Sequence, residues 1–291
     1  MANNIALFKQ YIAGVLDEVY KNASLTAVLD GANDLVQQGA NANELLIPKM
    51  SMDGLGDYSR GTGYVQGDVT LEMETVKCNF DRGRMFTVDS MDNIETAGVA
   101  FGRLAGEFIR TKVVPELDAF RFASYAGLSG ISTTTGADLS TGADVIAAIA
   151  AAADGMDNDE VPQSERYLFI TPTLFGLVRD MQTSQSRAVL DQFAGVIKVP
   201  QTRFYTAINQ LDGTTSGEQA GGYAKASGAK DINFMIIHKP AVIQFEKHVV
   251  PKIVTPEQNQ DADAWKFGYR NVSIADGYEN KLKGIYLHKN A

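Results

Sequence analysis

Four acidic side chains lie close together in the segment DGMDNDE, namely Asp154, Asp157, Asp159 and Glu160. Carboxylate oxygens at short spacing are the ligands that Ca²⁺ prefers in proteins. An EF-hand loop also needs Gly at its sixth position, and this segment does not provide it. We therefore interpret the segment as a solvated acidic loop and predict no calcium site there.

The three histidines, His238, His248 and His288, all fall in the last quarter of the chain. A zinc site needs Cys or closely spaced His pairs, and neither pattern is present. Cys78 is the single cysteine, and no His lies near it in sequence to activate it as a nucleophile. We expect these residues to occupy ordinary strand positions, without a metal site or a catalytic thiol.

Glycine-rich segments also fail to match the motifs that bind phosphate or expose a nucleophile. GGYAKASGAK at 221–230 lacks the Ser or Thr that follows Lys in a P-loop. GLSG at 127–130 does not match GxSxG, and no dinucleotide-binding fingerprint follows a strand. The sequence therefore predicts no catalytic, cofactor-binding or metal-binding residue and favours a protein that is not an enzyme. A soluble α+β enzyme with an unrecognised site is the alternative from another class.

The chain has 291 residues, of which 45% are hydrophobic and 21% charged, an ordinary globular composition. Its net charge of -9 disfavours a free-standing nucleic-acid binder, because an acidic surface repels phosphate. A single cysteine permits no intrachain disulfide, which fits a reducing compartment. We find no secretion signal and no apolar run of about 20 residues, so we expect a protein made in the cytoplasm and not inserted in a membrane.

The segment from Gly67 to Asp89 has the pattern of two strands. Val69, Leu71 and Met73 alternate with polar residues, which is the period of two expected of a strand with unlike faces. RMFTVD follows as the return strand, and FDRGR between them predicts a turn. This interpretation places a charged group at the tip of a hairpin: Asp81, Arg82 and Arg84. An isolated hairpin is marginally stable, so it needs another surface, either in its own domain or on a neighbour.

A long helix is predicted directly after this hairpin, from Asp92 to Ala126. Its apolar residues recur at helical spacing, and Pro115 should kink it or start a second helix. Three glycines stand four residues apart on one side, which predicts close approach of another element: Gly98, Gly102 and Gly106.

The remaining segments complete a mixed α+β pattern. An amphipathic helix is predicted near the N-terminus from Phe8 to Val19, followed by a polar segment with short strands from Gly31 to Gly67. RYLFI predicts a buried strand, and Thr171-Pro172 after it is a typical helix start. The C-terminal quarter is rich in strand patterns.

The order of these parts resembles the major capsid proteins of tailed bacteriophages, which have the Hong Kong 97 phage fold. The stretches that carry the resemblance are NFDRGRMFTVDSMDN, VPELDAFRFA, RYLFITPTLFGLV, INFMIIHKPAVI, FGYRNVSIADGY and GIYLHK. The resemblance implies an α+β fold with five parts: an N-terminal arm and helix at 1–47, an extended E-loop hairpin at 48–90, a P-domain spine helix at 91–135, a mainly A-domain section at 136–235, and C-terminal strands at 236–291 that return through the P- and A-domains.

The resemblance also implies a function and partners. Subunits of this family assemble as hexamers and pentamers into an icosahedral shell that encloses double-stranded DNA without sequence-specific binding. The implied location is the virion, after assembly in the host cytoplasm. The implied partners are further copies, a portal, a scaffolding protein and decoration proteins. The E-loop lies across a neighbour, so the hairpin residues named above become candidate contact residues and the three glycines candidate spine-packing residues. The alternative within the same fold is an encapsulin-like nanocompartment that packages protein cargo.

Overall fold

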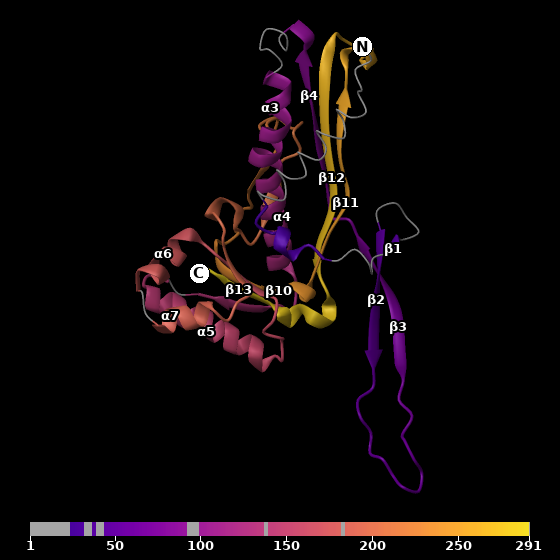
Figure 1. The fold of residues 1–291 in the computed structure, drawn as a ribbon, viewed down its shortest axis with the longest axis vertical. Coiled ribbons are helices and arrows are strands. Elements are labelled where there is room, and N and C mark those ends of the chain that lie inside the picture. Colours follow the sequence, from indigo (N-terminus) through magenta and orange to yellow (C-terminus); the bar gives the residue numbers. More distant parts are fainter. Residues whose placement is uncertain are drawn as a thin grey trace, which may run out of the picture.

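The computed structural model describes residues 24–31, 37–38, 44–91, 99–136, 139–181 and 184–290. Within these residues the molecule is elongated (Figure 1): a compact α/β body, a long sheet beside a long helix, and a hairpin that projects away from both. The helix predicted at Phe8–Val19 lies outside the described residues, as does the start of the long helix at Asp92. The fold is mixed α+β, as the sequence predicts.

The long helix is continuous through the described residues but changes its winding in the middle. It comprises α3 (Val99–Phe108), a π-helical turn η3 (Ile109–Val113) and α4 (Val114–Gly127). Pro115 stands in the first turn of α4 and lacks the N–H that an α-helical bond back to Thr111 would need. The wider π turn lies at this point, so the predicted disturbance at Pro115 takes the form of a π turn within a continuous helix.

One side of this helix packs on a three-stranded antiparallel sheet in the order β11 (Val242–Val254), β12 (Ala264–Gly277) and β4 (Phe80–Asp89). Ile109, Val113 and Leu117 of the helix meet Phe267 and Tyr269 of β12 in a buried apolar cluster. The sheet and the helix therefore hold each other along most of their length.

The body contains a five-stranded sheet between two helical layers. Its order is β5 (Ser132–Thr135), β13 (Ile285–Lys289), β10 (Ile232–His238), β6 (Arg166–Ile170) and β7 (Gly195–Lys198). α4 covers one face through Phe122 and Tyr125. The other face is covered by α5 (Gly142–Asn158), α6 (Pro172–Met181) and α7 (Ser184–Leu190). α6 begins at Pro172, as predicted.

The smaller elements connect these parts. β8 (Ile208–Gln210) and β9 (Tyr223–Lys225) form a short ribbon between the body and the long helix. Short 3-10 turns are η1 (Ala27–Leu29), η4 (Gln201–Arg203), η5 (Lys239–Ala241), η6 (Pro256–Gln258) and η7 (Glu279–Gly284). The projecting hairpin belongs to a separate antiparallel sheet in the order β1 (Gln37–Gln38), β2 (Glu44–Met52) and β3 (Val69–Lys77).

The predicted hairpin between β3 and β4 is wrong. β3 pairs with β2, whereas β4 pairs with the distant β12, in a register that places Phe80 opposite Ser273. Asn79 gives a local reason, because its side-chain amide exchanges two hydrogen bonds with the backbone of Ala275 in β12, at 2.8 and 3.1 Å. The chain is thereby transferred from one sheet to the other at Asn79, and Phe80 enters the core beside the long helix. The predicted E-loop range 48–90 thus covers most of the true hairpin together with a strand of another sheet.

Candidate functional site

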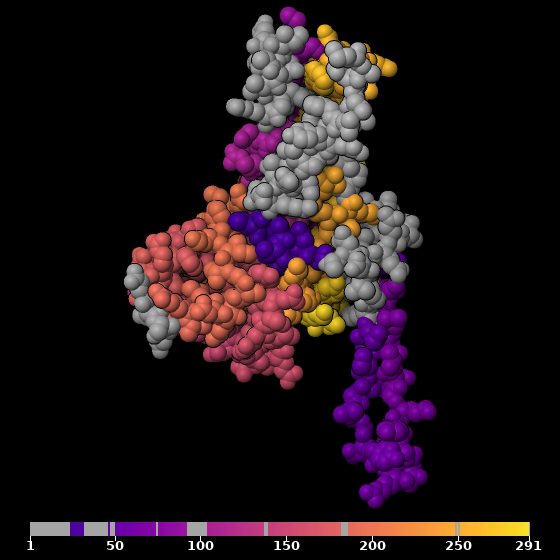
Figure 2. All heavy atoms as spheres, viewed as in Figure 1, coloured from indigo at the N-terminus to yellow at the C-terminus, as the bar shows by residue number. Residues whose placement is uncertain are grey.

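The projecting hairpin carries one exposed apolar face. Met50 pairs with Leu71 and Met52 with Val69, and cross-strand partners point to the same face of a sheet. Met73 lies on this face as well, two residues along β3 from Leu71. All five side chains are exposed, and Figure 2 shows the hairpin standing clear of the body. The predicted alternation of Val69, Leu71 and Met73 is therefore present, and Met50 and Met52 extend it.

The tip of this hairpin, residues 53–68, is polar and rich in glycine, with apolar side chains fully open to solvent. Leu55 is fully exposed among the described residues. Tyr58 and Tyr64 contact each other with ring centroids 4.9 Å apart, next to a small turn closed between Ser59 and Gly63. The tip thus has its own local order but leaves most of its apolar surface exposed.

The charged residues predicted at a hairpin tip occupy a different place. Asp81, Arg82 and Arg84 lie in β4, inside the three-stranded sheet. Asp81 forms a two-pronged ion pair with Arg270 of β12, at 2.6 and 2.8 Å. All three therefore make contacts within their own chain, and their predicted position at a tip is corrected.

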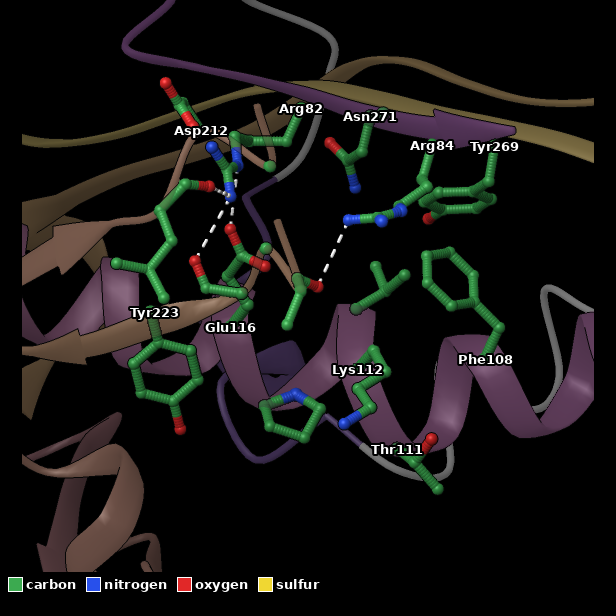
Figure 3. Close-up of a pocket in the computed structure, with 18 of the residues that line it drawn as sticks. Arg82, Arg84, Phe108, Thr111, Lys112, Glu116, Asp212, Tyr223, Tyr269 and Asn271 are labelled. Carbon is green, nitrogen blue, oxygen red and sulfur yellow. Dashed lines mark hydrogen bonds and ion pairs between the residues drawn. The ribbon is translucent and has the colours of Figure 1, made fainter. Parts of the chain in front are cut away.

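Arg82 lies at the centre of a cleft between β4, the long helix and the loop 211–222 (Figure 3). Its Nε donates to Oε1 of Glu116 at 2.8 Å, and its Nη2 donates to the carbonyl oxygens of Leu211 and Gly222 at 2.7 and 3.2 Å. One guanidinium group thus joins the strand, the helix and both ends of the loop. Burial raises the pKa of Glu116, and the positive charge of Arg82 acts against this rise.

Arg84 holds the outer part of the same loop. Its Nη1 and Nη2 donate to the carbonyl oxygens of Ala220 and Gln219, at 3.1 and 2.9 Å. The loop is also organised from within, because Asp212 accepts hydrogen bonds from the Thr215 hydroxyl and from the backbone N–H groups of Thr214 and Thr215. These hydrogen bonds hold the pKa of Asp212 far below its usual range. The loop therefore forms a fixed wall of the cleft.

The cleft has a volume of about 980 Å³. Its apolar lining includes Phe86 and Phe108, whose ring centroids lie 4.8 Å apart. Asn271 of β12 lines it too; this side chain is 1% exposed, and neither its Nδ2 nor its Oδ1 has a hydrogen-bond partner within the described chain. In Figure 3 the amide of Asn271 points from the sheet into the space between Arg82 and Arg84. Sequence reasoning did not single out Asn271, because a lone Asn within a strand carries no motif.

A second group of polar residues that sequence reasoning missed is buried where the segment 24–31 crosses α4. Asp118 is fully buried and accepts hydrogen bonds from Leu25 N, Thr26 N and Thr26 Oγ1, and also from Arg203. Arg121, also fully buried, donates to Thr26 Oγ1 at 2.9 Å and to Glu246 at 3.0 Å. The available signal was the placement of Asp118 and Arg121 on the apolar stripe of a helix, where an unpaired charge is too costly.

The predicted packing role of the three glycines is not decided within this chain. Gly98 lies outside the described residues, and nothing is described around Gly102. At Gly106, among the described residues outside its own helical backbone, no atom lies within 4 Å of the position that a Cβ would occupy. The close approach of another element to these glycines therefore stays a prediction.

Among the described residues, no three His, Cys, Asp or Glu side chains are grouped so that they could hold a metal ion. His238 and His288 lie in β10 and β13, and burial lowers the pKa of both imidazoles. Asp157 forms an ion pair with Arg166. Within the same residues, no helix combines the length and apolarity needed to span a membrane.

Comparisons with known proteins address the fold. No protein-family model and no curated protein matches the sequence. Solved structures do match: a chain of Gordonia phage Cozz aligns with a TM-score of 0.60 at 11% identity, over 92% of this chain and 86% of that one. The capsid structure of Staphylococcus phage Andhra aligns with a TM-score of 0.56 at 12% identity, over 90% and 83%. This protein has the fold of phage capsid proteins.

A virus-like particle from Pyrococcus furiosus aligns with a TM-score of 0.57 at 9% identity, over 97% of this chain and 99% of that chain. The alignment covers both chains almost completely, so the capsid fold accounts for the hairpin, the long helix and the body together.

Proposed function

We propose that the protein is a shell-forming structural subunit, the major capsid protein of a tailed phage. The observation that carries this proposal is the projecting hairpin, because its apolar face is exposed among the residues that the structure describes. A two-stranded ribbon with exposed Met50, Leu71 and Met73 is only marginally stable in water. Burial of these side chains against another molecule would stabilise it. The fold shared with capsid structures makes a second copy the natural partner.

In this proposal each structural part has a role in the shell. The hairpin of β2 and β3 is the E-loop, which lies across a neighbouring subunit. The long helix with the β11–β12–β4 sheet forms the P-domain, and the five-stranded sheet with α5–α7 forms the A-domain. Subunits assemble as hexamers and pentamers into an icosahedral shell around double-stranded DNA. Assembly takes place in the host cytoplasm, with a portal, a scaffolding protein and decoration proteins as further partners.

The acidity of the chain supports a shell that holds DNA without binding its sequence. A net charge of -9 repels phosphate, so packed duplex would move freely against the inner wall. The second candidate is an encapsulin-like nanocompartment with protein cargo, which the similarity to a virus-like particle favours. Both candidates are structural and need no catalytic residue.

Electron microscopy of the purified full chain, with light scattering alongside, tests the proposal. We expect closed shells, sheets or tubes from the wild type. Leu71→Asp should abolish them by placing a charge on the apolar face, whereas Thr70→Asp, on the opposite face of the same strand, should leave them intact. A stable monomer that fails to assemble even with salt, crowding agents or a candidate scaffold contradicts the proposal. DNA or protein inside the shells separates the phage capsid from the nanocompartment.

A further inference from the structure

The cleft around Arg82 contains a buried polar group that the described chain leaves without a partner. Both the donor and the acceptor of the Asn271 amide are unsatisfied, and the side chain points into the cleft. Buried polar atoms in folded proteins nearly always have partners. A side-chain amide offers one acceptor and a donor side by side, which matches the N–H and C=O groups of an extended peptide. The Asn271 amide therefore matches a ligand that offers a main chain or an equivalent amide.

The charges in the cleft indicate what else this ligand carries. Each carboxylate of the lining is already engaged: Asp81 with Arg270, Glu107 with Arg110, Glu116 with Arg82, and Asp212 with its own loop. By contrast, no carboxylate among the described residues forms an ion pair with Arg84 or Lys112, although both line the cleft. The available charge is thus positive, and it favours an acidic ligand.

The apolar part of the lining favours one hydrophobic side chain. Phe86 and Phe108 form an edge-to-face pair beside Leu104, and Phe108 is only partly buried. Such a pair can take up an aliphatic side chain and cover it from water. The cleft therefore fits an extended peptide with a central apolar residue and flanking carboxylates.

The hairpin tip of this same chain has that chemistry. Asp53-Gly54-Leu55-Gly56-Asp57 places a fully exposed Leu55 between two carboxylates, of which Asp53 accepts a hydrogen bond from the backbone N–H of Asp68 at 2.8 Å. The Cβ position of Gly54 is open, whereas that of Gly56 lies against Val65. Within one molecule the tip lies far from the cleft (Figure 1). We propose that the cleft of one copy binds residues 53–57 of a second copy, with Leu55 against Phe108, carboxylates at Arg84 and Lys112, and the main chain at Asn271. This inference rests on the proposed assembly of the chain with itself and specifies its recognition site.

A binding assay that does not depend on assembly tests the inference. The probe is a fluorescently labelled peptide of residues 51–59, SMDGLGDYS, titrated with the full-length protein and followed by fluorescence anisotropy. We expect saturable binding that weakens at least about tenfold when Leu55 of the peptide is replaced by Ala. Replacing both aspartates of the peptide by Asn should also weaken binding and remove most of its dependence on salt.

Variants of the protein locate the site. Asn271→Leu should weaken peptide binding while raising the melting temperature of the free protein, because it removes a buried amide without partners. Lys112→Ala should weaken binding without changing the melting temperature, since this side chain is exposed and has no ion pair with any residue that the structure describes. Lys252→Ala is the matched control, because Lys252 lies on the opposite face of the same sheet, beside Met85 and Gly268. It should leave binding unchanged.

The outcomes separate this inference from the proposed function. Absence of peptide binding, or equal binding by Asn271→Leu and Lys252→Ala, overturns the inference even if the wild type forms shells. Competition by a single-stranded oligonucleotide with equal affinity also overturns it, because it would show a general anion site. Specific peptide binding by a chain that never assembles upholds the recognition and contradicts the shell.

Discussion

Asp118 in the middle of α4 accepts a 2.7 Å hydrogen bond from the hydroxyl of Thr26, a residue 92 positions earlier in the chain. The same carboxylate accepts from the backbone N–H groups of Leu25 and Thr26. Arg203 forms an ion pair with it, with Nη1 of Arg203 3.2 Å from Oδ2 of Asp118. A single buried carboxylate thus fixes the segment 24–31 onto the helix that links the two cores.

We predict that Asp118→Ala lowers the free energy of unfolding by about 3–5 kcal/mol, because it leaves buried donors and the Arg203 charge without their acceptor. Asp118→Asn should cost less, since it keeps one acceptor oxygen. Denaturant titration followed by fluorescence measures the free energy of unfolding of both variants. Asp261→Ala serves as the control: Asp261 pairs with Lys266 but is 83% exposed, so the change should be small. Equal effects at the two positions would refute the anchoring role of Asp118.

We predict that Arg82→Ala loosens the loop 211–222 and lowers the free energy of unfolding by about 1–3 kcal/mol, since Glu116 loses its partner in a largely buried site. Arg82→Lys should not restore the wild type, because one ammonium group cannot reach Glu116 and two carbonyl groups in the same geometry. Hydrogen exchange of the loop amides is the direct readout. Arg179→Ala, in an exposed pair with Asp180, is the comparison, and similar loop exchange in both variants would exclude this function of Arg82.

The sequence was informative where a local pattern decides the structure. The strand from Val69, the helix start at Pro172 and the disturbance at Pro115 follow from period, capping and the missing proline N–H, and all three are present. The pairing of β4 could not be predicted in this way, because its partner strand is distant in sequence. β4 follows β3 after two residues, yet it pairs with β12 because Asn79 bonds to Ala275 and Phe80 enters the core beside the long helix.

In the candidate site, too, residues that belong to a local sequence pattern could be predicted, whereas residues that depend on distant contacts could not. Val69 and Leu71 could be found because their alternation is visible in the sequence. Met50 and Met52 were missed because β2 contains Pro48 and lies in a segment rich in Gly, Asn and Asp, which favours loop over strand. Asn271 could not be found at all, since its unsatisfied amide is a property of its surroundings rather than of its neighbours in sequence.

We predict that stability falls when the pH is lowered through the range in which the histidines titrate. Burial lowers the pKa of His288 below its ordinary value of 6.5, so the unfolded chain takes up a proton before the folded chain does. The stabilising contribution is complete above pH 6.5 and is lost as the pH falls toward the lower pKa of the folded state. Burial also lowers the pKa of His238, so His238 changes the stability in the same direction as the pH falls.

Melting curves between about pH 7.5 and about pH 5.5 measure this effect. His288→Gln should reduce the fall in melting temperature without abolishing it, because His238 still titrates. Gln can keep a hydrogen bond to Asn233, whose Nδ2 lies 3.1 Å from Nδ1 of His288. An unchanged pH dependence in His288→Gln would show that His288 does not contribute to it.

Two glycines should respond to Ala in opposite ways. A Cβ at Gly136 would collide with the ring of His288, which is buried and stacked on Phe234 and cannot move aside freely. Gly136→Ala should therefore destabilise the protein by about 1–3 kcal/mol. Gly155 lies inside α5, and among the described residues outside its own helical backbone no atom lies within 4 Å of its Cβ position. Gly155→Ala should therefore stabilise the protein by about 0.5–1 kcal/mol through helix propensity. Denaturant midpoints compare the two, and a stabilising Gly136→Ala would contradict the packing of His288 against this edge of the sheet.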